Sequence, residues 1–65
     1  MTFEQLANAL NRLPADAARA ELLDLLDRLQ CDGSSTRENI CGRFDAYAAD
    51  LSTDAQRAYH AAMRA

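Results

Sequence analysis

The sequence contains no lysine, no tryptophan, no valine and only one histidine, and these absences limit the chemistry available to it. It has no glycine-rich phosphate-binding loop, and its two cysteines do not have the C-x₂₋₄-C spacing of zinc sites. A Ser-His-Asp combination can be proposed for almost any chain that contains one histidine. Ser34, Ser35 and His60 therefore do not indicate a catalytic site. We therefore expect a protein that is not an enzyme and that uses no cofactor or metal.

Long apolar runs are also absent from the sequence. No segment approaches the roughly 20 apolar residues that are needed to cross a membrane. The first residues, Met1, Thr2, Phe3 and Glu4, lack the positive region and the apolar region of a signal peptide. These features predict a cytoplasmic protein that does not associate with a membrane.

Size and charge narrow the class of partner. The chain has 65 residues, a net charge of −3 and a pI of about 4.8. This length predicts one domain, residues 1–65. Domains of this size bury only about 60% of their unfolded surface, so a homodimer that completes the core is one expected arrangement. The acidic balance disfavours nucleic acid and favours a protein partner with a basic surface.

Composition and periodicity predict an all-α fold, a compact bundle of four short helices in one domain. Scarce β-branched apolar residues disfavour strands. The first helix is expected to begin at the N-cap Thr2, with Gln5 completing a capping box, and to end before Pro14. The second is expected from about Pro14 to Gln30, because proline is favoured in a first turn.

The other two helices are predicted from caps and from a glycine turn. Gly33 is the expected left-handed residue after the second helix. Ser35 and Glu38 form a second expected capping box, and Ser52 is the expected N-cap of the last helix, with Asp54 in its first turn. The residues expected to face the core recur at helical spacing: Phe3, Leu6, Ala7, Leu10, Leu13, Ala18, Leu22, Leu25, Leu26, Leu29, Ile40, Phe44, Tyr47, Ala48, Leu51, Ala55, Tyr59, Ala62 and Met63.

The second predicted helix carries an acidic face, and this face is one candidate binding surface. Asp16, Asp24 and Asp27 lie opposite its apolar stripe, with Glu21 at the edge. Leu23 projects towards this acidic side, which suggests an intermolecular contact. The alternatives are a plain solvated face and a patch that engages a basic groove on a nucleic-acid-handling protein.

The third predicted helix carries a face of small residues, Gly42, Ala46 and Ala49, away from its apolar stripe. Three interpretations are open. The helix is central and packs neighbours on both sides, the face docks a partner or a second copy, or the alanines are simply exposed. Gly42 argues against simple exposure, because a mid-helix glycine costs up to about 1 kcal/mol.

An alternative function is a dimeric DNA-binding regulator with a helix-turn-helix-like third helix. Arg37, Asn39 and Arg43 are the residues that could contact DNA bases in this arrangement. The acidic second helix opposes it, and so does Ser34 after Gly33, where such motifs usually place an apolar anchor.

Cys31 and Cys41 leave a further alternative open. If the second and third helices form an antiparallel hairpin, both sulfurs lie near the same end, and a disulfide could form. Free structural thiols suit a cytoplasmic protein better. A redox or metal-binding role is the third alternative.

These features together favour a small, acidic, non-enzymatic protein-interaction module. The bias towards Ala, Arg, Leu and Asp without Lys is what GC-rich codons give. This bias suggests a GC-rich bacterium or its phage as the origin. In size, acidity and suspected origin the chain resembles, in type only, small phage-encoded inhibitors of host defence machinery, including anti-CRISPR proteins. That resemblance implies inhibition of a host nucleic-acid-handling complex. The contact residues expected for a partner are Leu23, Asp24, Asp27, Gly42, Ala46 and Ala49.

Overall fold

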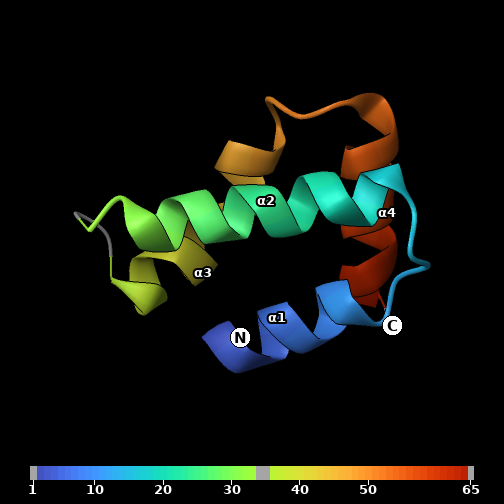
Figure 1. The fold of residues 1–65 in the computed structure, drawn as a ribbon. Helices are drawn as coiled ribbons and strands as arrows, with labels where there is room; N and C mark the ends of the chain where they lie inside the picture. The colour runs from blue at the N-terminus through green and yellow to red at the C-terminus, as the bar shows by residue number, and fades with distance from the viewer. Residues whose placement is uncertain (1, 34–35, 65) are drawn as a thin grey trace.

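The computed structural model describes residues 2–33 and 36–64, and these residues form four α-helices and no strand. The helices are α1 (Phe3–Asn11), α2 (Ala17–Cys31), α3 (Arg37–Ala48) and α4 (Thr53–Arg64). In Figure 1, α1 and α2 run antiparallel, α3 passes behind α2, and α4 crosses the end where α2 begins. The all-α prediction is therefore confirmed.

The start of α1 confirms the predicted capping box. The Gln5 N–H donates to the Thr2 hydroxyl at 3.2 Å, and the Thr2 N–H donates to the Gln5 side-chain oxygen at 2.9 Å. Two backbone donors that the first helical turn leaves without partners are satisfied in this way.

The predicted start of α2 at Pro14 is wrong, because Asp16 is the N-cap. The Asp16 backbone is extended, and its carboxylate accepts a hydrogen bond from the Arg19 N–H at 3.1 Å. Pro14 lies two residues earlier, in the connection from α1. A carboxylate can satisfy an orphan N–H of the first turn and a proline side chain cannot, so the acidic residue determines where the helix begins.

The start of α3 also differs from the prediction. Ser35, the expected N-cap, lies outside the described residues, and the helix begins after Thr36. The Thr36 hydroxyl accepts a hydrogen bond from the Asn39 N–H at 3.2 Å, so Thr36 is the N-cap. The third residue after this cap, where a capping box requires Glu or Gln, is Asn39, and Glu38 is only the second. The predicted Ser35–Glu38 capping box is therefore not the one that begins α3. Gly33 has the expected left-handed backbone, with φ 72°.

The start of α4 combines a predicted cap with a contact that was not predicted. The Ser52 hydroxyl accepts from the Ala55 N–H at 3.2 Å, which confirms Ser52 as the N-cap. The carboxylate of Glu21, on α2, accepts the Ser52 N–H at 2.8 Å and the Ser52 hydroxyl at 2.9 Å. One carboxylate thus connects α2 to the beginning of α4.

All four helices contribute to a single hydrophobic core, and each helix contacts the other three. Among the described residues, no Leu, Ile, Phe, Tyr or Met is exposed. The Cα radius of gyration is 10.7 Å, close to the value of about 11 Å expected for a compact chain of this length. The buried core residues match the predicted stripes: Leu6, Leu10, Leu22, Leu25, Leu26, Ile40, Phe44, Ala48, Ala55, Tyr59 and Ala62.

Candidate binding surfaces

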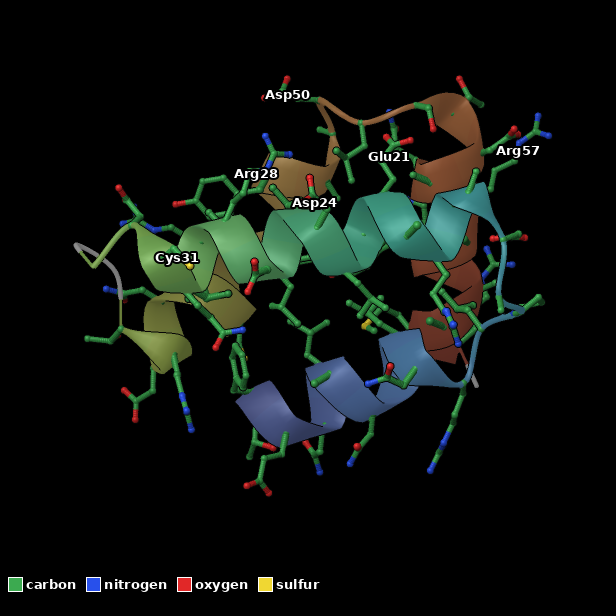
Figure 2. All side chains as sticks on the ribbon, viewed as in Figure 1. Glu21, Asp24, Arg28, Cys31, Asp50 and Arg57 are labelled. Atoms are coloured by element: carbon green, nitrogen blue, oxygen red, sulfur yellow. The ribbon has the colours of Figure 1, made fainter. Side chains whose placement is uncertain are left out.

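The outward face of α2 carries the acidic candidates Asp24 and Asp27, and both side chains are exposed. Asp24 pairs with Arg28 one turn later, with 3.3 Å between carboxylate and guanidinium, and both side chains are about two-thirds exposed, at 68% and 65%. Figure 2 shows Asp24, Arg28 and Cys31 along this helix. An exposed pair of this kind contributes only a few tenths of a kcal/mol, so a partner's charge could replace Arg28 at little cost.

The acidic face is smaller than the sequence suggested, because the fold itself uses two of its carboxylates. Asp16 caps α2, and Glu21 is half-buried with both oxygens bound to Ser52. Asp24 and Asp27 remain. Asp27 has no ion-pair or hydrogen-bond partner among the described residues.

Leu23 does not stand out from the acidic side as expected. It is half-buried and packs against the hydrophobic core. The expectation that Leu23 is an unsupported apolar residue among carboxylates is therefore wrong.

The outward face of α3 is open. Gly42, Ala46 and Ala49 are all exposed. A Cβ added at Gly42 would meet no atom within 4 Å, so no neighbouring helix requires a glycine there. The interpretation that α3 is central and packs a neighbour on its small-residue face is therefore wrong. The docking face and the simply exposed face remain as alternatives.

The six partner-binding candidates come from two parts of the fold. Leu23, Asp24 and Asp27 are on α2, Gly42 and Ala46 are on α3, and Ala49 is the C-cap that follows α3. Both helices pack on the same core, and in each case the exposed candidates lie on the side away from it. The result is one acidic face and one face of small residues, each on its own helix.

The alternative DNA-contacting residues are also divided. Arg37, Asn39 and Arg43 are exposed, and the Arg37 guanidinium lies 5.1 Å from the centre of the Phe3 ring on α1. Asn39 and Arg43 are one turn apart and share a face. Arg37 and Arg43 are six residues apart, which places them about 120° apart around the helix. Arg37 therefore stacks on α1 instead of extending the face of the other two.

Polar chemistry within the fold is concentrated where α3 meets α4. The Tyr59 hydroxyl donates to the Asp45 carboxylate, and the exposed His60 ring lies 5.6 Å from the Tyr59 ring. Burial raises the pKa of Tyr59 above its ordinary value, and the hydrogen bond to Asp45 and the charge of Asp45 raise it further. A tyrosine that holds its proton this firmly is a weaker acid than an ordinary tyrosine, and its hydroxyl remains a hydrogen-bond donor to Asp45.

The two cysteines are free thiols, Cys31 exposed and Cys41 half-buried. Burial raises the pKa of the Cys41 thiol, which lowers its reactivity. Among the described residues, no group of three His, Cys, Asp or Glu side chains is placed to hold a metal ion.

The described residues form two sizeable clefts beside α4, and the sequence predicted neither. One, of about 460 Å³, lies between α1 and the last turns of α4. The other, of about 400 Å³, lies where α2 and α4 begin and is lined by Asp16, Glu21 and Asp54. Both pair residues from distant parts of the chain. In the sequence, helical spacing alone places four lining residues on one side of the first helix: Gln5, Asn8, Ala9 and Arg12. No nearby residue indicates that α4 packs beside them.

The fold and these surfaces define a small all-α protein with two contrasting outward helix faces and two clefts beside α4. Comparison of the chain with protein-family models, with curated proteins and with solved structures finds no match. None of the helices within the described residues is long and apolar enough to span a membrane.

Proposed function

We propose that this protein is a small, acidic, non-enzymatic module that binds another protein through its outward helix faces. The expected partner has a basic surface, as nucleic-acid-handling proteins do. The narrower form of the proposal is inhibition of such a complex in the manner of the phage-encoded inhibitors that the chain resembles in type. Binding by complementary charge accelerates association and selects the partner.

The observation that carries the proposal is Gly42. It lies in the middle of α3, it is exposed, and nothing in the folded chain occupies the space of a missing side chain. Glycine in that position lowers helix stability by about 0.5–1 kcal/mol relative to alanine. Close approach of a partner's backbone is a physical reason to keep glycine there, and Ala46 and Ala49 extend the same low surface along the helix.

Asp24 and Asp27 support the basic character of the partner. Most other carboxylates have a role in the fold, at a cap, in a first helical turn or on Tyr59. Asp27 has no partner among the described residues, and Asp24 has only an exposed Arg28. These two charges are therefore available for an intermolecular contact.

The proposal is tested by affinity capture of the tagged protein from lysate of its natural host, with and without nuclease. We expect one stoichiometric protein that survives nuclease treatment. The double variant Asp24→Lys and Asp27→Lys should lose that protein, while helix content by circular dichroism stays unchanged. Glu4→Lys is the control, because it reverses one exposed charge on α1, outside both faces, and its place in the first turn predicts a loss of only about 0.3–1 kcal/mol of stability.

Two results would count against the proposal. Retention of the protein by the Asp24→Lys, Asp27→Lys variant would show that the acidic face is not the contact. Recovery of nucleic acid, or of proteins that nuclease removes, would favour DNA binding through Asn39 and Arg43 instead, with a strong dependence on salt.

A further inference from the structure

The cleft between α1 and α4 has an apolar floor and a polar rim on one side. Gln5, Asn8, Ala9 and Arg12 line it from α1 at the i, i+3, i+4, i+7 spacing of one helix flank. The remaining lining residues are apolar: Leu13, Ala61, Ala62 and Met63. Its volume of about 460 Å³ is that of a small-molecule site, which typically spans about 300–1,000 Å³.

The charge of this cleft is opposite to that of the protein. The chain as a whole has a net charge of −3, but Arg12 is the one charged side chain among the described residues that line the cleft. Arg12 is exposed, and it has no ion pair among the described residues. The Asn8 side-chain amide also has no hydrogen-bond partner there. The cleft therefore offers an unused guanidinium and an unused amide next to apolar carbon.

We propose that this cleft binds a small organic monocarboxylate with an apolar tail. The carboxylate pairs with Arg12, whose planar guanidinium suits a two-oxygen anion. The tail lies against Ala9, Ala62 and Met63, where methionine can adjust to its shape. A single cation favours a ligand with a single negative charge, and the volume lies within the range of small-molecule sites. This site is separate from the outward faces of α2 and α3, so the proposal does not depend on partner binding.

The test uses the full chain labelled with ¹⁵N and titrated with hexanoate, and in parallel with hexanamide, which has the same tail and no charge. Chemical-shift changes should saturate and be confined to residues that line the cleft. Hexanoate should bind about two- to fivefold more tightly than hexanamide, the range given by one exposed ion pair.

Two variants with the same change in charge separate a specific pair from a general charge effect. Arg12→Gln should abolish the preference for hexanoate. Arg57→Gln should keep the preference, because Arg57 is exposed on α4, does not line the cleft and points away from the body of the protein in Figure 2. Equal binding of the two probes to the unmodified protein, no saturable binding, or shifts spread over the surface would overturn the proposal.

Discussion

Tyr59 contributes both to the hydrophobic core, through its ring, and to a hydrogen bond between α4 and α3, through its hydroxyl. Its ring is buried, and its centre lies 5.3 Å from that of Phe44 on α3. Its hydroxyl donates to Asp45. Because burial disfavours the phenolate and Asp45 adds a negative charge, the pKa of Tyr59 is raised above its ordinary value near 10. The folded state therefore holds this proton more firmly than the unfolded state does.

This difference predicts the sign of a pH effect. A group with a raised pKa in the folded state contributes stability below the unfolded pKa, and the contribution is lost as pH rises above about 10. The free energy of unfolding of the unmodified protein should therefore fall above pH 10. The free energy of unfolding of Tyr59→Phe should fall less steeply over the same pH range. At pH 7, Tyr59→Phe should cost about 0.5–1.5 kcal/mol through loss of the hydrogen bond to Asp45.

The measurement is urea denaturation from pH 7 to pH 11.5 on the unmodified protein and on Tyr59→Phe. Tyr47→Phe is the control, since it removes a phenol from α3 that donates to no carboxylate among the described residues. Parallel pH curves for the unmodified protein and Tyr59→Phe would contradict the assignment of this effect to Tyr59.

Among the helices, α2 shows how a side chain and not a proline determines the first residue. Asp16→Ala should lower the free energy of unfolding by about 1 kcal/mol, because the Arg19 N–H loses its acceptor. Asp54→Ala is the matched control. Asp54 lies in the first turn of α4 behind the cap Ser52, so only the weaker interaction with the helix dipole is lost. Equal losses for the two variants would contradict a capping role for Asp16.

The Glu21–Ser52 contact is the polar link between α2 and α4. Glu21→Gln removes the charge and one acceptor, and we expect a loss of about 1 kcal/mol. Ser52→Ala removes the hydroxyl from the same contact. A double-mutant cycle should give a coupling of at least about 0.5 kcal/mol between the two positions.

The control is Asp24→Asn, because Asp24 belongs to an exposed ion pair and its replacement should change stability by less than about 0.5 kcal/mol. Simple additivity of Glu21→Gln and Ser52→Ala would argue against the link.

The features that the sequence predicted correctly are local ones. The Thr2–Gln5 box, the left-handed Gly33 and the cap at Ser52 each depend on residues within a few positions of one another. The apolar stripes are also local, because helical periodicity alone places their residues on one face. The wrong starts of α2 and α3 reflect competition between neighbouring residues that can all cap or begin a helix.

The features that could not be predicted join distant parts of the chain. Glu21 and Ser52 are 31 residues apart, and Arg37 meets Phe3 across two helices. Leu23 looked exposed on an isolated helix, and only the packing of its neighbours buries it. The open space at Gly42 likewise required the positions of all the other helices.

At the scale of the whole molecule, the described residues of one chain pack around a single hydrophobic core, and the expected homodimer stays a prediction. The small size of the chain made a homodimer one expected way to complete the core. The described residues, however, leave no exposed large apolar side chain for a homodimer to bury. The exposed surface carries negative charge on α2, from Asp24 and Asp27, and small residues on α3, Gly42 and Ala46. Both properties fit the proposed partner, a protein with a basic surface.

The proposed function predicts that Gly42→Ala has opposite effects on the stability of the free chain and on its affinity for the partner. In the free chain, Gly42→Ala should raise the free energy of unfolding by about 0.5–1 kcal/mol, because its methyl group meets no atom and the helix gains a better former. In the complex, the same methyl group would stand between two closely packed backbones. Overpacking of this kind usually costs about 1–3 kcal/mol.

The most direct measurement is therefore a calorimetric titration of the captured partner with the unmodified protein and with Gly42→Ala. Asp54→Glu is the control, since it adds one methylene at an exposed site away from both faces. We predict that Gly42→Ala binds at least about fivefold more weakly although it is the more stable protein. An unchanged affinity for Gly42→Ala would contradict the proposal that the small-residue face of α3 is where the partner docks.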